Sequence, residues 1–191
     1  MTAASKDGGR AFGALNPYSR AYTHVAYACP ASAPCVRGVG FDPLRAPHWP
    51  VNVRKIRIVI ADDHPAFRHV LQHIIEGEPD MSVVAAVGDG VAALDVVRRL
   101  APDVAVLDVR MPGLDGIEVA RRLADDRLPT RAVIVTMQAE RVVFDRAIAA
   151  GASGYVLKDT AMSEVVEAVR TVARGQTYVT AAMSARFGHG T

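Results

Sequence analysis

From Val53 onward, short apolar runs alternate with longer segments whose apolar residues recur at helical spacing. The apolar runs are rich in valine, isoleucine and alanine, which predicts strands buried on both faces. We place these strands at residues 56–61, 82–87, 103–107, 132–136 and 154–157. The amphipathic segments predict helices at residues 65–77, 90–100, 115–125, 141–150 and 163–174. Such an alternation predicts a doubly wound α/β fold, a five-stranded parallel sheet covered by helices on both faces.

The two ends of the chain lack this pattern. Residues 1–52 contain six prolines and no useful strand or helix period, which predicts a disordered or weakly ordered extension. Val51 and Val53 lie just before the first strand, and valine codons can serve as bacterial starts, so a translation start there is a further hypothesis. We expect one folded domain at residues 53–175, followed by a tail or truncated linker at 176–191.

The composition narrows the class of protein. Half of the 191 residues are hydrophobic, yet no apolar run is long enough to span a bilayer, and the first residues lack the pattern of a secretion signal. The net charge is +2, but residues 53–175 carry 16 basic and 18 acidic residues, which does not predict a nucleic-acid-binding face. Cys29 and Cys35, the only cysteines, do not form a metal or disulfide pattern. We therefore expect a cytoplasmic protein without membrane contact.

Chemically active side chains follow the carboxyl ends of four predicted strands. Asp62 and Asp63 follow the first strand and Asp108 follows the third. Thr136 ends the fourth strand and Lys158 follows the fifth. Because the carboxyl ends of parallel strands meet at one edge of an open sheet, we expect these side chains to share a pocket.

The three carboxylates in this pocket need opposite charge. Two unit charges about 4 Å apart repel by roughly 4 kcal/mol at an effective dielectric constant near 20. Lys158 offsets one negative charge, and a divalent cation would offset the other two; oxygen ligands favour Mg²⁺. Such a site is suited to phosphoryl transfer onto a carboxylate. In this hypothesis Asp108 is the nucleophile, Lys158 pairs with the transferred charge and Thr136 donates a hydrogen bond to a phosphoryl oxygen.

Four ordered blocks carry a resemblance to a known family. The blocks "VIADDHPAFR", "VLDVRMPGLDGIEVARRL", "VIVTM" and "AGASGYVLKD" together resemble the receiver domain of two-component response regulators, over about residues 54–175. The first and last blocks are most similar to the subfamily that has a C-terminal helix-turn-helix DNA-binding domain. The resemblance implies a flavodoxin-like receiver fold and a sensor histidine kinase as partner. It also implies homodimerisation on phosphorylation, and a signalling protein rather than an enzyme.

The resemblance also implies roles for individual residues. Asp108 would be the phospho-acceptor, and Mg²⁺ would be held by Asp62, Asp63, Asp108 and the main-chain carbonyl of Arg110. Thr136 and Lys158 match the switch hydroxyl and the lysine of the family.

Three further positions match the family pattern in other ways. Tyr155 matches the aromatic side chain that turns inward when the switch hydroxyl engages phosphate, although an ordinary core tyrosine is an alternative. Arg110 and Gln138, two positions after the phospho-acceptor and the switch hydroxyl, occupy the places that tune the slow loss of phosphate.

Two interpretations remain for what the phosphorylated receiver acts on. After the last predicted helix only Gly175 to Thr191 remain, too few residues for a DNA-binding domain. DNA would therefore be bound only through a missing C-terminal domain, as in a truncated transcription regulator. The alternative is a stand-alone phosphorelay or protein-interaction receiver. The last predicted helix lacks the Ser-Pro start common in relatives, and we expect Thr160 to cap it instead.

Other interpretations explain fewer of these residues. Gly88-x-Gly90-x-x-Ala93 mimics a dinucleotide-binding fingerprint, but Asp89 would set a negative charge beside the pyrophosphate. A dehalogenase-type phosphatase needs a second acid two positions after its nucleophile, where this chain has Arg110.

Two helical pairs have simpler explanations than catalysis. Asp115 and Glu118 are predicted to cap the third helix. His69 and His73 have metal-like spacing but no third ligand, so a solvated helix face is the better interpretation.

Overall fold

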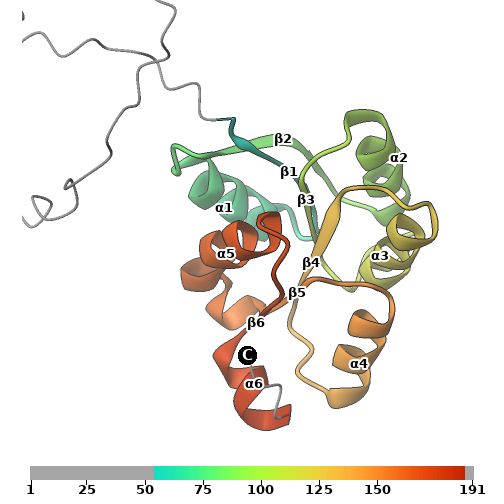
Figure 1. Cartoon of the computed structure of the whole chain (residues 1–191). Helices are drawn as coiled ribbons and strands as arrows, with labels where there is room; N and C mark the ends of the chain where they lie inside the picture. The colour runs from blue at the N-terminus through green and yellow to red at the C-terminus, as the bar shows by residue number, and fades with distance from the viewer. Residues whose placement is uncertain (1–53, 188–191) are drawn as a thin grey trace, which may run out of the picture. The chain divides into compact units, whose positions relative to one another are not determined.

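The computed structural model describes residues 54–187, so the predictions for residues 1–52 lie outside the described residues. Its described part contains a six-stranded parallel sheet in the order β2-β1-β3-β4-β5-β6 (Figure 1). The strands are β1 (Ile56–Ala61), β2 (Met81–Val87), β3 (Val104–Leu107), β4 (Arg131–Thr136), β5 (Gly154–Leu157) and β6 (Tyr178–Val179). The helices are α1 (Pro65–Glu76), α2 (Gly90–Leu100), α3 (Gly116–Asp125), α4 (Arg141–Ala149), α5 (Lys158–Ala173) and α6 (Ala181–Phe187).

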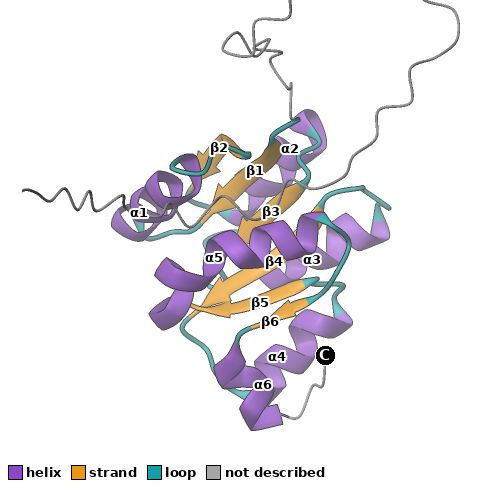
Figure 2. Cartoon of the chain, turned by 60° about the vertical axis from the view of Figure 1, so that its left-hand side comes forward, coloured by secondary structure: helices purple, strands orange, loops and turns teal. Residues whose placement is uncertain are grey.

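Helices cover both faces of the sheet, because successive strand residues point to opposite faces. In β1, Val59 and Ala61 join the hydrophobic cluster formed with α2, α3 and α4, whereas Ile58 and Ile60 join the cluster formed with α1 and α5. Figure 1 and Figure 2 show these two groups of helices on opposite sides of the sheet. Burying an isoleucine or valine of this kind contributes about 1.5–3 kcal/mol. The predicted doubly wound α/β fold is confirmed, and within residues 54–187 no helix is long and apolar enough to cross a membrane.

The sheet has six strands, whereas the sequence predicts five. β6 pairs in parallel with β5, with Gly154 opposite Tyr178 and Tyr155 opposite Val179. A strand of two residues is too short to show an alternating pattern, so its sequence carries no strand signal. Met183 of the following α6 is fully buried, so the end of the described chain packs onto the sheet.

The largest difference in an element boundary concerns α5. It begins at Lys158, five residues before the predicted start, and the other predicted boundaries agree within one residue. The Thr160 hydroxyl lies inside this helix and donates to the Leu157 carbonyl at 3.3 Å, so the prediction that Thr160 caps the helix is wrong. The physical reason is Ala161, whose full burial extends the apolar face of Val165 and Val169 back by one turn.

Candidate functional site

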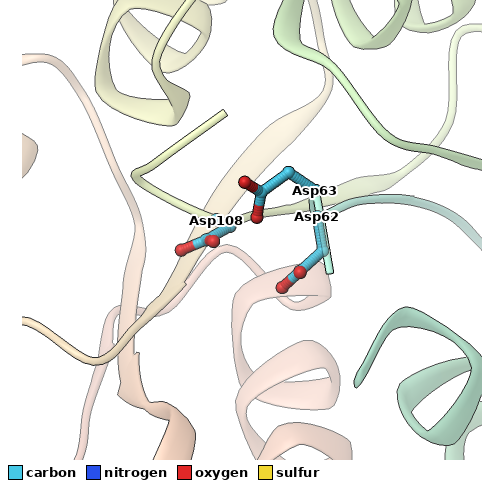
Figure 3. Close-up of side chains that lie close together, drawn as sticks. All are labelled: Asp62, Asp63 and Asp108. Atoms are coloured by element: carbon cyan, nitrogen blue, oxygen red, sulfur yellow. The ribbon is translucent and has the colours of Figure 1, made fainter. Parts of the chain in front are cut away.

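Three carboxylates gather at the carboxyl edge of the sheet, as the sequence predicts. β1 and β3 are neighbours, and the Asp108 N–H donates to the Ala61 carbonyl at 2.8 Å, so Asp62 and Asp108 leave adjacent strands side by side. Asp62, Asp63 and Asp108 each bring an oxygen within 4.8 Å of the others (Figure 3). Asp62 is 1% exposed and Asp108 is 6% exposed, whereas Asp63 is exposed at the mouth of the site. The two acids of the doublet therefore differ in environment.

Lys158, which follows β5, reaches across β4 and forms ion pairs with two of these carboxylates. Its ammonium nitrogen lies 2.8 Å from Asp108 Oδ2, to which it donates a hydrogen bond, and 2.7 Å from Asp62 Oδ2. The ammonium group also lies over the Phe67 ring of α1, 4.7 Å from its centroid, a favourable cation–π contact. Lys158 therefore has a fixed position between β1, β3 and α1.

The charges in the pocket shift the pKa of its groups in opposite directions. Burial raises the pKa of Asp108, and the nearby charge of Asp62 raises it further, whereas Lys158 and the Arg110 backbone N–H lower it. Burial alone would lower the pKa of Lys158, but the hydrogen bonds and charges of Asp108 and Asp62 outweigh this effect and raise it. Lys158 is therefore charged at neutral pH, and the formal charge of one ammonium group and three carboxylates is −2.

The donor set fits a divalent cation. Asp62 Oδ1 accepts the His64 backbone N–H at 2.8 Å, and the buried Asp62 Oδ2 pairs with Lys158 Nζ at 2.7 Å. Three carboxylate oxygens close together suit Mg²⁺, which prefers hard oxygen ligands and keeps several waters.

The loop after β1 shapes the Asp62 side of the pocket. The His64 side chain accepts the Phe67 backbone N–H at 3.4 Å and Pro65 takes the first helical position, which together start α1 immediately after the acid doublet. The Arg68 guanidinium donates to the Asp62 carbonyl. Sequence reasoning missed Phe67 and Arg68 as supports of the site, because their distance from Lys158 and Asp62 depends on how α1 packs.

The loop after β3 shapes the Asp108 side. Asp115 caps α3 by accepting the Glu118 backbone N–H at 2.6 Å, which confirms the Asp115 half of the predicted capping pair, whereas the Glu118 carboxylate accepts hydrogen bonds from Arg121 and Arg122. Gly116 was also missed: a Cβ atom there would lie 2.0 Å from the Asp108 carbonyl oxygen, so only glycine allows this approach. The GLDG sequence around it was the available signal. α3 therefore begins directly against the backbone of Asp108.

Arg110 is exposed on the same loop and lines an open depression of about 440 Å³ beside the carboxylates. Asp63, Gln138 and Arg146 also line this depression. Both positions expected to tune phosphate loss, Arg110 and Gln138, therefore face the mouth of the site. The role of the Arg110 carbonyl as a metal ligand stays a prediction.

Thr136 and Tyr155 meet at a shared residue. Thr136 ends β4 in a buried position, and its hydroxyl accepts the Gln138 backbone N–H at 3.2 Å. The Tyr155 hydroxyl donates to the Gln138 carbonyl at 2.7 Å, and its ring packs edge-on against Phe144 with centroids 5.2 Å apart. Tyr155 is fully buried, and burial raises its pKa, so the phenol stays neutral and remains a hydrogen-bond donor. Tyr155 thus lies inward, linked to the loop that follows Thr136.

The geometry disfavours a dinucleotide site at Gly88-x-Gly90. The Asp89 carboxylate caps α2 by accepting the Ala92 N–H at 2.7 Å, so a negative charge occupies the place of a pyrophosphate. A Cβ atom at Gly90 would lie 2.0 Å from the Leu114 carbonyl oxygen, so this glycine accommodates protein backbone.

His69 and His73, for which the sequence favours a solvated helix face, lie on the surface of α1. Both side chains are exposed, and the cluster of potential metal ligands found in residues 54–187 is the one of the three aspartates.

Comparisons with known proteins agree with this site. The family model of the response regulator receiver domain matches residues 58–170. The "Probable transcriptional regulatory protein NarL" of Mycobacterium tuberculosis and the "Oxygen regulatory protein NreC" of Staphylococcus aureus are each 38% identical over 125 residues, 65% of this chain and 58% of those proteins. The chain thus spans little more than half the length of these curated relatives.

Solved structures show the same similarity. The signal receiver domain of NarL from Mycobacterium tuberculosis is 39% identical with a TM-score of 0.63, covering 64% of this chain and 99% of that one. A LuxR-family two-component response regulator from Aurantimonas is 32% identical with a TM-score of 0.67, covering 70% of this chain and 96% of that one. With its carboxylate cluster and its parallel sheet, this chain belongs to the family of response regulator receiver domains.

Proposed function

We propose that Asp108 accepts a phosphoryl group from a sensor histidine kinase, and that the phosphorylated protein controls transcription. One observation supports this role above the others: the buried Asp108 carboxylate is held at 2.8 Å by the Lys158 ammonium, inside a cluster of three carboxylates. Asp62, Asp63, Asp108 and the Arg110 carbonyl would hold Mg²⁺. When bound, this ion neutralises negative charge between the carboxylate and the incoming phosphoryl group.

The residues of the chain perform the transfer by position and charge. An Asp108 oxygen forms a bond to phosphorus, the bond between phosphorus and the kinase histidine nitrogen breaks, and its electron pair leaves with the imidazole. Lys158 keeps Asp108 ionised and then pairs with the phosphoryl group, which adds about −1.5 to −2 charge. The Thr136 hydroxyl donates to a phosphoryl oxygen. Water later attacks the acyl phosphate, and it reaches the site through the depression that Arg110 and Gln138 line.

The first experiment is phosphorylation of the purified chain by acetyl phosphate with Mg²⁺, read as intact mass. We expect the wild type to gain the mass of one phosphoryl group and Asp108→Asn to gain none. Asp95→Asn on α2, an exposed carboxylate away from the site, is the matched control and should behave as wild type. No gain in folded wild-type protein would refute the proposal and leave a phosphate-independent interaction domain. The elution volume of the same samples tests homodimerisation on phosphorylation.

Control of transcription rests on the printed name of the relative NarL, a probable transcriptional regulatory protein of which this chain matches 58%. DNA would be contacted through a domain beyond the receiver, because residues 53–175 carry more acidic than basic residues. A DNA-binding assay of the purified 191-residue chain tests whether the receiver itself contacts DNA. We expect no sequence-specific binding by the phosphorylated chain alone, and tight specific binding would contradict it.

A further inference from the structure

The segment Tyr178–Phe187, here called the β6–α6 segment, is hydrogen-bonded to the backbone of β5 and of the residue before it. The Tyr178 N–H donates to the Ser153 carbonyl at 2.9 Å, and the Thr180 N–H donates to the Tyr155 carbonyl at 3.0 Å. The Thr180 carbonyl then accepts the Met183 N–H at 3.0 Å, which opens α6. Tyr155 therefore holds the turn between β6 and α6 through its main chain.

Side chains continue the same connection. The Phe187 ring stacks on Phe144 with centroids 5.9 Å apart and an interplanar angle of 27°, and Phe144 meets Tyr155 edge-on. Met183 is fully buried in the same hydrophobic cluster, and the Arg141 guanidinium lies over the Phe187 ring at 5.3 Å. α6 therefore covers the ring that supports Tyr155.

Tyr155 also contacts the loop that follows Thr136. Its hydroxyl donates to the Gln138 carbonyl, and the Gln138 N–H donates to the Thr136 hydroxyl. A single buried side chain is thus shared between the β6–α6 segment and the loop beside the phospho-acceptor. Any change in the position of this loop alters the support of both Tyr155 and α6.

The docked segment carries an uncompensated polar atom. The Thr180 hydroxyl oxygen is buried and has no hydrogen-bond partner in the described residues. A buried hydroxyl without a partner disfavours the state that buries it. The Thr180 hydroxyl therefore weakens docking of the β6–α6 segment, so a small change in free energy at the Gln138 loop changes the fraction of molecules in which the segment is docked.

We propose that docking of the β6–α6 segment and phosphorylation of Asp108 favour one another through Tyr155. This inference rests on the proposed function. Phosphate that engages Thr136 fixes the Gln138 loop, the loop fixes Tyr155 inward, and inward Tyr155 supports Phe144 beneath α6. Because coupling between two sites is reciprocal, a better docked segment also stabilises the phosphorylated state.

Hydrogen exchange tests the coupling on the full chain, treated with acetyl phosphate and Mg²⁺ and checked by intact mass. The Tyr178 and Thr180 amides report docking, since they bond to Ser153, just before β5, and to Tyr155 of β5. We expect their exchange to slow by about fivefold or more on phosphorylation, the lower range of allosteric coupling. A phosphate gain with unchanged exchange would overturn the coupling alone. No phosphate gain would overturn the coupling together with the proposed function.

Two substitutions should change the docking of the β6–α6 segment, and with it the phosphorylated fraction, in opposite directions. Met183→Ala removes the buried anchor of α6, so exchange at β6 should rise and the phosphorylated fraction at fixed acetyl phosphate should fall. Met162→Ala, the same change at a side chain 46% exposed on α5, is the matched control. Thr180→Val removes the unpartnered hydroxyl at nearly constant shape, so exchange should slow and the phosphorylated fraction should rise. A phosphorylated fraction equal to wild type in both Met183→Ala and Thr180→Val would refute the coupling.

Discussion

Gly116, the first residue of α3, lies directly against the backbone of Asp108, and replacing it with alanine should disturb both stability and phosphorylation. The new Cβ would lie 2.0 Å from the Asp108 carbonyl oxygen, a full 1.0 Å inside the 3.0 Å that real Cβ atoms keep. Overpacking of this kind costs about 1–3 kcal/mol, and the lower entropy of the unfolded alanine chain returns only about 0.4–1 kcal/mol. We expect Gly116→Ala to lower the free energy of unfolding by about 1–2 kcal/mol.

The same shift should slow the chemistry. Relief of the contact moves the Asp108 backbone by about 1 Å, and a misplacement of that size can slow a reaction by about 100-fold. Urea unfolding followed by circular dichroism measures the stability, and the rate of mass gain with acetyl phosphate and Mg²⁺ measures the chemistry. The rate is measured without urea, on protein shown to be folded.

Gly77→Ala is the matched control for this prediction. Gly77 ends α1 with helical backbone angles, φ −65° and ψ −18°, and a Cβ there would lie 3.2 Å from the nearest atom, the Ile74 carbonyl oxygen. Its stability should stay within about 1 kcal/mol of wild type, with an unchanged rate of phosphorylation. If Gly116→Ala matched this control in both measurements, the inferred contact between α3 and Asp108 would be wrong.

Three further predictions concern charge. The Arg170 hydrogen bond lowers the pKa of Asp80, so this ion pair stabilises the fold above pH 3.8, and the contribution is lost as the pH falls through the lower pKa of the folded state. In urea unfolding at pH 7, Arg170→Gln should therefore cost about 1 kcal/mol or less, and in strong acid it should not differ from wild type. Because burial raises the pKa of Asp108, its charge opposes folding above pH 3.8, and Asp108→Asn should unfold at pH 7 with a free energy no lower than wild type. Mg²⁺ at 100 times its Kd should raise the free energy of unfolding by about 2.7 kcal/mol, and Asp62→Asn should abolish the gain in the same titration.

The sequence by itself determined most of the elements of the fold. Strand and helix periods arise from residues a few positions apart, so β1 and α1 could be recognised without knowledge of their neighbours. The same reasoning failed where an element is too short, or its apolar side chains too small, to show a period. β6 has two residues, and the small side chain of Ala161 hid the first turn of α5.

The sequence also determined which side chains could meet. The carboxyl ends of parallel strands share one edge, so Asp62 and Asp108 could be placed together although 46 positions separate them. The distances could not be predicted, because they depend on which strands are neighbours and on how loops pack. Only the tertiary structure buried Asp62 while exposing Asp63, and only it brought Lys158 within 2.8 Å of Asp108.

Contacts between elements were decided by the tertiary structure alone. The approach of Gly116 to the Asp108 backbone depends on where α3 sits against the sheet, and no local period records it. The same holds for the contact of Phe187 with Phe144, which places a segment expected to be a tail beside Tyr155. A local pattern reports which face of an element is apolar; the packing of the whole chain decides what covers that face.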